Sequence, residues 1–195
     1  DQLEADYKES EYNARVSAQK LSSIRKKTAK VFSERVREEM SFLNMPNVQI
    51  VTQFENTDFY EKGTDKVEFL ISANPGEPPR PVAKIASGGE LSRMMLAIKT
   101  VLASTEDIDT LIFDEVDTGI SGSAAQKVGL KLKEVSKSSQ VLCVTHQAQL
   151  AALADAHYLI SKQVEDGRTF TQVKLLDFDG RKHELARIIG GVNIT

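Results

Sequence analysis

Two carboxylates in a row, Asp114 and Glu115, follow the apolar run 110–113, and Asp117 comes two residues later. Such a run predicts a strand, and in open α/β sheets ligands bind beyond the carboxyl ends of the strands. Two neighbouring acids there can divide the work of hydrolysis. One supplies an oxygen ligand for Mg2+, directly or through water, and the other acts as general base for a water nucleophile. The alternative is that solvent-exposed acids simply end a strand.

A histidine stands at the corresponding place in a second strand. The apolar run 140–145 ends at His146. If the two strands are neighbours, about 4.8 Å separates them, and His146 lies within side-chain reach of the Asp114–Glu115 pair. A lone histidine is more often structural, so this assignment depends on the acids beside it.

The third candidate is the stretch Ser87-Gly88-Gly89-Glu90, which opens a predicted helix over residues 87–103. Ser87 at the N-cap and Glu90 three residues later fit a capping box, which is the structural alternative. A cap does not explain two glycines, each of which costs about 1 kcal/mol relative to alanine inside a helix. Free backbone amides and a hydroxyl at a helix start suit an anion such as a phosphate.

A long helix must come first, because residues 1–44 contain no glycine and no proline and carry many charges. Apolar residues recur at spacings of three and four along two lines, which is typical of an amphipathic helix with a narrow, coiled-coil-like seam. Proline disfavours helical geometry in the residue before it, so Pro46 marks the end.

The rest of the chain predicts an α/β fold. Residues 48–54 and 66–73 read as two antiparallel strands, and residues 74–81 as a loop. Strands and helices then alternate, which indicates a parallel sheet with right-handed crossovers. The expected elements are strand 110–113, helix 121–135, strand 140–145, short helix 148–154, strands 157–162 and 169–176, and helix 181–189.

The composition is that of an ordinary globular protein and excludes few classes of function. With a net charge of -3 and 27% charged residues, bulk electrostatics makes no case for nucleic-acid or membrane binding. The basic run 25–27 could meet DNA phosphates, although such runs on a coiled coil are usually its solvated face. Cys143 sits in an apolar run and is expected to be a buried, reduced and unreactive thiol. No window is apolar enough to span a bilayer, so a cytoplasmic protein is expected.

Taken together, the three polar stretches resemble the motifs of ABC-type ATPases of the chromosome-maintenance (SMC-like) branch. Residues 86–93 resemble the signature motif with glutamate for the usual glutamine, residues 111–115 the Walker B strand, and residues 145–147 the switch histidine. The strings 74–77 and 114–122 resemble bacterial DNA-repair members of this branch. The match implies two domains: a descending coiled-coil arm helix at residues 1–44 and the C-terminal lobe of the ATPase head at residues 45–195.

The resemblance also implies roles for individual residues. Asp114 would hold Mg2+ through its water shell, Glu115 would polarise the attacking water, and His146 would contact the γ-phosphate of ATP. The signature residues would bind the ATP held on the opposite head of a dimer; they are Ser87, Gly88, Gly89 and Glu90. Many relatives have an interface aspartate where this chain has Ser121, which leaves Ser121 as a weaker substitute in a head–head contact. Ala86 opens the signature as in the DNA-repair members.

One expected part is missing. The phosphate-binding pattern G-x-x-x-x-G-K-[ST] occurs nowhere in the sequence. The resemblance places that Walker A loop in an N-terminal half, so this chain is expected to be inactive alone and to act with that half, with a second head and with DNA at the nucleoid. The implied function is an ATP-gated clamp in double-strand-break repair and recombination. The alternatives are another chromosome-maintenance ATPase, or a coiled-coil scaffold that does not use nucleotide.

Overall fold

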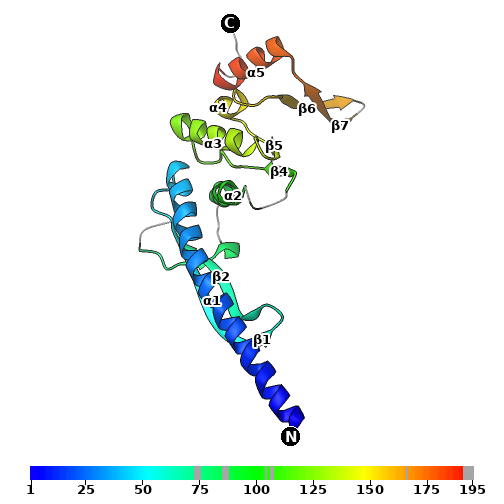
Figure 1. Ribbon diagram of the computed structural model, residues 1–195. Helices are drawn as coiled ribbons and strands as arrows, with labels where there is room; N and C mark the ends of the chain where they lie inside the picture. Colours follow the sequence, from blue (N-terminus) through cyan, green and yellow to red (C-terminus); the bar gives the residue numbers. More distant parts are fainter. Residues whose placement is uncertain (73–75, 85–87, 104, 106–107, 166, 191–195) are drawn as a thin grey trace. The chain divides into compact units, whose positions relative to one another are not determined.

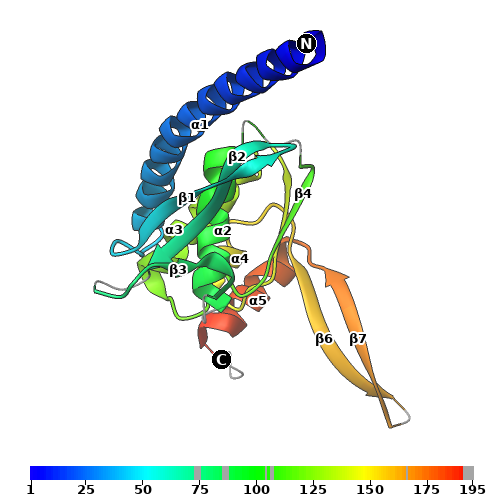
Figure 2. The same cartoon turned by 90° about the horizontal axis from the view of Figure 1, so that it is seen from below.

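The computed structural model describes residues 1–72, 76–84, 88–103, 105, 108–165 and 167–190. The chain divides into two compact units, Asp1–Ala86 and Ser87–Thr195. Figures 1 and 2 show their elements. The long helix thus belongs to the same unit as the strands that follow it. The assignment of residues 1–44 to an arm and 45–195 to a head lobe stays a prediction.

The first unit begins with the predicted long helix, α1, which spans Gln2–Phe42. It ends at a Schellman motif, in which the Met45 amide donates to the Met40 carbonyl at 2.9 Å and the Asn44 amide to that of Ser41 at 3.2 Å. Asn44 takes the left-handed conformation that this motif requires, with φ of 67°. The motif therefore stops the helix before the chain reaches Pro46.

A three-stranded antiparallel sheet of order β1-β2-β3 follows. Its strands are β1 (Gln49–Tyr60), β2 (Gly63–Ser72) and β3 (Arg80–Pro81), followed by the short 3-10 helix η1 (Val82–Lys84). The predicted antiparallel pair is confirmed, with Gln49 opposite Ser72 and Asn56 opposite Asp65. The hairpin is longer than predicted, and its turn lies just before Gly63, whose φ of 103° suits glycine.

The two apolar lines of α1 have different environments. Val36 and Met40 are fully buried, and the ring of Phe32 lies 5.5 Å from that of Phe69 on β2. Ile24 and Val31, on the other line, remain about half exposed. One line therefore belongs to the fold of this chain, while the other is an open seam.

A buried carboxylate ties the hairpin to α1. Asp65 is 4% exposed. It accepts hydrogen bonds from the Ser22 hydroxyl at 2.8 Å and from the Arg25 guanidinium at 3.4 Å. A buried charge is tolerated only when it is paired in this way, so these contacts set the register of the hairpin along the helix.

The second unit contains the alternating elements. They are α2 (Gly88–Leu102), β4 (Thr110–Phe113), α3 (Gly122–Val135), β5 (Gln140–Cys143), α4 (Ala148–Ala151), β6 (Tyr158–Glu165), β7 (Arg168–Leu175) and α5 (Phe178–Gly190). β4 and β5 pair in parallel, with Thr110 opposite Gln140 and Phe113 opposite Cys143. The condition on which the placement of His146 depends, that these two strands are neighbours, is therefore met. β6 and β7, near the strands predicted over 157–162 and 169–176, pair with each other as an antiparallel hairpin.

The helices pack in sequence, α2 on α3, α3 on α4 and α4 on α5. Buried apolar residues such as Val128 and Leu132 line this contact. The parallel sheet is covered less completely: Ile112 is 70% exposed, and Leu142 and Val144 are about half exposed. Within the described residues, none of the helices combines the length and apolar character needed to cross a bilayer.

Candidate functional site

Asp114 and Glu115 follow β4 and are both exposed. The Val144 amide donates to the Phe113 carbonyl at 3.0 Å, so the parallel ladder continues up to the first acid. Glu115 has a φ of 56°, a left-handed conformation that is uncommon in residues other than glycine. Strained backbone of this kind clusters at functional sites, and here it turns the chain sharply at the second acid.

Asp117 is the centre of the polar contacts behind this pair. It is 1% exposed and accepts hydrogen bonds from the Thr145 hydroxyl and from the His146 amide, the latter at 3.3 Å. The Thr145 oxygen in turn accepts from the Gln147 amide at 3.0 Å. The Gln147 side chain donates to the Ile120 carbonyl at 3.1 Å. The acid-bearing loop and the histidine-bearing loop are therefore joined through one buried carboxylate.

His146 lies where the strand pairing predicts, and its imidazole ring contacts Asp117. Its Nδ1 is 3.6 Å from an Asp117 carboxylate oxygen, and its side chain is 73% exposed. The backbone of His146 is thus held while most of the ring faces solvent. Sequence reasoning noted Asp117 as a third carboxylate but gave it no role. The position of Asp117 shortly after the strand was the one indication in the sequence. The sequence does not show that its carboxylate is buried and bonded to Thr145 and His146.

The start of α2 packs closely against the same loop. A Cβ on Gly88 would lie 2.5 Å from a Glu115 carboxylate oxygen. A Cβ on Gly89 would lie 2.8 Å from the carbonyl oxygen of Thr118. The helix tip and the acid-bearing loop therefore approach as closely as glycine permits, which is a reason for the glycine pair within this chain. Binding of a nucleotide at these amides stays a prediction.

Two further side chains of α2 hold this approach. The Ser92 hydroxyl donates to the Asp114 carbonyl at 2.7 Å. Arg93 is 7% exposed, and its guanidinium donates to the Thr118 carbonyl at 2.8 Å. Burial lowers the pKa of Arg93, and nearby Glu90 acts in the opposite direction. Sequence reasoning did not single out Ser92 or Arg93.

The other predicted site residues have different positions. Ser87, with Ala86, lies outside the described residues, so neither its predicted cap nor its predicted phosphate contact has a structural counterpart here. Glu90 is partly buried in the first turn of α2. Ser121 is exposed, takes the N-cap position of α3 with extended backbone and makes no side-chain cap bond there.

Cys143 ends β5 next to this network. Burial, and then the negative charges of Asp117 and Asp114, raise the pKa of its thiol to about 12. The thiolate is the nucleophilic form, so this cysteine is unreactive at neutral pH. That agrees with its interpretation as a small hydrophobic residue.

The donor set suits Mg2+ only in part. Asp114 offers an exposed hard oxygen at the end of the strand, of the kind Mg2+ prefers. Over the described ranges no group of three or more His, Cys, Asp or Glu side chains is placed to hold a metal ion. Mg2+ is usually bound by one or two carboxylates together with substrate phosphates and waters. Asp114 fits that mode and does not form a complete protein cage.

Comparison with solved structures identifies the class. The Smc head domain with a coiled coil and joint from Pyrococcus yayanosii matches 95% of this chain and 34% of its own length, with a TM-score of 0.65 at 21% identity. A chain from work on ATP-driven dimerization and DNA-stimulated activation of SMC ATPases matches 86% of this chain and 96% of its own, with a TM-score of 0.52 at 22% identity. The fold is that of part of an SMC-type head domain.

Comparison with curated proteins finds similar proteins, and no family model matches. The chain is 42% identical to the DNA repair protein RecN of Halalkalibacterium halodurans over all of its length, and 43% identical to that of Bacillus subtilis over 92% of it. It is 46% identical to RecN of Treponema pallidum over 88%. By sequence the chain is similar to part of the RecN proteins, and it spans about a third of their length, 35% in the first case.

Proposed function

We propose that this chain is the C-terminal part of a RecN-type ATPase head and supplies the signature helix, the hydrolytic acid and the switch histidine. The observation that carries the proposal is the convergence on one loop. The tip of α2 closes on Glu115 and Thr118, while Asp117 of the same loop holds the backbone of His146. Packing alone does not require an exposed acid, a left-handed glutamate and an exposed histidine at one end of a parallel pair.

The residue roles follow from chemistry and position. Asp114 would hold Mg2+ through water, and the ion would offset phosphate charge when bound. Glu115, which is exposed beyond the strand, would orient and deprotonate a water molecule. His146 presents an exposed ring that can donate to a phosphate oxygen. The signature segment, Ser87 to Glu90, would face the ATP of a second head, with Ser121 near the same interface.

The remaining functions belong to the whole protein. ATP bound between two heads would close a homodimer, and hydrolysis would reopen it. The Walker A loop would come from the N-terminal half of the same protein. We infer that DNA is the partner and the nucleoid in the cytoplasm the location, since the relatives carry the name DNA repair protein and a similar fold occurs in SMC ATPases whose activation is described as DNA-stimulated. Double-strand-break repair is the process that this combination suits.

The test is reconstitution from two pieces. The chain is mixed with a fragment that carries a G-x-x-x-x-G-K-[ST] loop, and ATP hydrolysis is measured with and without DNA. We expect turnover only in the mixture. Glu115→Gln should lower it by about 10²–10⁴-fold, as loss of a general base does. The exposed Glu165→Gln, at the end of β6, is the matched control and should leave turnover unchanged.

Two results would contradict the proposal. Turnover by this chain alone, insensitive to Glu115→Gln, would show that the acid is not the base. Association of the two pieces without any nucleotide-dependent turnover would favour a coiled-coil scaffold. The close packing of Gly88 and Gly89 against their own loop is also expected of a scaffold that binds no nucleotide. The measurement of nucleotide-dependent turnover therefore decides between the ATPase and the scaffold.

A further inference from the structure

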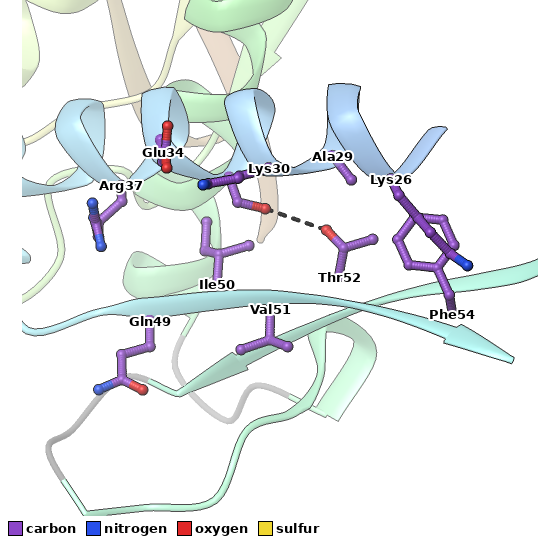
Figure 3. Close-up of a pocket in the computed structure, with 11 residues that line it drawn as sticks. Lys26, Ala29, Lys30, Glu34, Arg37, Gln49, Ile50, Val51, Thr52 and Phe54 are labelled. Atoms are coloured by element: carbon purple, nitrogen blue, oxygen red, sulfur yellow. Dashed lines mark hydrogen bonds between the residues drawn. The ribbon is translucent and has the colours of Figure 1, made fainter. Parts of the chain in front are cut away.

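An open groove of about 490 Å3 lies in the first unit, between α1 and β1. Figure 3 shows the helix on one side and the strand on the other. The acids and the histidine of the candidate site belong to the second unit. Its volume is within the range of ligand-binding sites in proteins.

The groove follows the free edge of a strand. β1 is the outer strand of the sheet, and among the described residues it pairs with β2 and with no other strand. The consecutive residues Gln49, Ile50, Val51 and Thr52 all line the groove, although successive side chains point to opposite faces of a strand. The backbone edge itself must therefore form the wall.

That edge has unused hydrogen-bonding capacity. In an antiparallel strand, alternate residues direct their N–H and C=O groups to one neighbour and the others to the opposite side. Throughout the part of the chain that the structure describes, residues 49–54 make no backbone–backbone hydrogen bond outside the sheet. Exposed edges of this kind are templates for another strand.

The opposite wall is a basic stripe. Lys26, Lys30 and Arg37 line the groove at spacings close to one and two helical turns, and Glu34 is the one acid among the residues that line it. Among the described residues, no ion pair is recorded for Lys30 or Arg37, and both side chains are exposed. Lys26 lies 5.8 Å from the centroid of the Phe54 ring.

The floor is apolar and fixed. Ile50 and Phe54 are partly buried and face α1, and Ala29 of α1 lies on the side of the helix that faces β1. A hydrogen bond of 3.2 Å between the hydroxyls of Ser33 and Thr52 holds the helix and the strand at a set separation. The groove thus offers a backbone edge, a small apolar floor and positive charge along its length.

We propose that this edge takes up an extended acidic peptide as an added strand, with its carboxylates directed at Lys30 and Arg37. A peptide strand matches both the donors and the acceptors of the β1 edge. A nucleic-acid backbone offers phosphate acceptors and would leave the outward carbonyls unpaired. A second copy of the chain, paired edge to edge, would bring two basic stripes together, which opposes association. The proposal does not depend on nucleotide chemistry.

Binding is tested by fluorescence anisotropy on the 195-residue chain. The probe is a fluorescein-labelled peptide of about eight residues that alternates Glu and Val, a length typical of strands. We expect the double variant Lys30→Glu, Arg37→Glu to weaken binding about tenfold or more, as loss of two ion pairs and their reversal implies. The matched control is the double variant Lys27→Glu, Arg35→Glu, which reverses two exposed charges of α1 outside the groove. It should change the affinity for the peptide less than about twofold.

A second arm tests the backbone without altering the protein. The same peptide, N-methylated at alternate residues so that one edge loses its donors, should lose binding to the unmodified chain. Unchanged affinity of that peptide overturns the proposal, even if the charge variants fail to fold. Binding of oligo-dT in place of the peptide, with the same charge dependence, overturns it in favour of nucleic acid. Failure of the acidic peptide to bind at all overturns it outright.

Discussion

Gly88 and Gly89 are adjacent, open the same helix and face the same loop, yet alanine should affect them in opposite ways. At Gly89 the new Cβ would lie 2.8 Å from the Thr118 carbonyl oxygen and 2.9 Å from its Cβ, so backbone must move. At Gly88 the new Cβ would meet the far end of the Glu115 side chain at 2.5 Å, which can rotate away. The pair is therefore an internal control.

The magnitudes follow from these contacts. Forcing an extra carbon into packed backbone costs about 1–3 kcal/mol. Weakening the Arg93–Thr118 hydrogen bond adds part of the roughly 1.5–3 kcal/mol that bonds to charged groups contribute. Alanine returns up to about 1 kcal/mol of helix propensity. The net loss for Gly89→Ala is then about 1–3 kcal/mol, and Gly88→Ala should be neutral or stabilising by up to about 1 kcal/mol.

Thermal unfolding followed by circular dichroism measures both. For a chain of this size we expect Gly89→Ala to lower Tm by about 2–10 °C and Gly88→Ala to keep or raise it. In the reconstituted ATPase, Gly88→Ala should slow turnover despite its stability, because Glu115 must leave its position. A Gly89→Ala protein as stable as the parent would refute the close approach of α2 to the acid-bearing loop.

Three further predictions concern the second unit. Asp117→Asn should cost about 1–3 kcal/mol of unfolding free energy in urea, and Thr145→Val should add less than its separate effect, because both act on one hydrogen bond. Burial raises the pKa of Cys143 to about 12, so iodoacetamide at pH 8 should label the native thiol far more slowly than the urea-unfolded one. The pKa of the Cys143 thiol is higher in the folded chain than its unfolded value of about 8.5. The stabilisation that comes from burying the neutral thiol is therefore complete below about pH 8.5 and is lost as the pH rises towards 12. The hydrogen bond from Arg187 lowers the pKa of Glu184, so this pair stabilises the fold above about pH 4.3, and the stabilisation is lost as the pH falls through the pKa of the folded state. Glu184→Gln should remove this pH dependence of the unfolding free energy. The effect should be at most about 1 kcal/mol, because the Arg187 side chain is 54% exposed.

Local patterns were sufficient for the elements whose structure is decided locally. The predicted strand 110–113 has the bounds of β4, and helix 121–135 differs from α3 by one residue. Both are short periodic segments with polar ends, and nothing distant competes with their preference. α5 begins three residues before its predicted start because the Asp177 carboxylate accepts from the Gly180 amide at 2.8 Å, a capping interaction that was not recognised.

The hairpin shows where local preference fails. Asn56 and Asp58 are turn-forming residues, yet both lie inside β1, and the turn comes after Tyr60. The pairing of Asn56 with Asp65 and the anchoring of Asp65 to α1 override the preference of each residue. Such contacts between distant segments leave no mark in a single sequence.

The candidate site was predicted as a set of neighbours, but not in its connections. Adjacent parallel strands bring Glu115 and His146 to one edge, which strand order alone implies. The buried role of Asp117 and the close approach of Gly89 to Thr118 depend on side-chain burial and on a helix docking angle. Neither the burial of a side chain nor the docking angle of a helix can be read from the spacing of residues in the sequence.

The β4–β5 pair exposes apolar side chains, and this exposure bears on how firmly the candidate site is held. Two strands alone are marginally stable in water, and this pair leaves Ile112 and Leu142 in contact with solvent. Asp114 directly follows β4 and His146 comes three residues after β5, so the rigidity of both depends on these two strands. If the proposed function holds, a partner that shields these two strands would also make the candidate site more rigid, and assembly would then raise activity without any side chain of the site having to move.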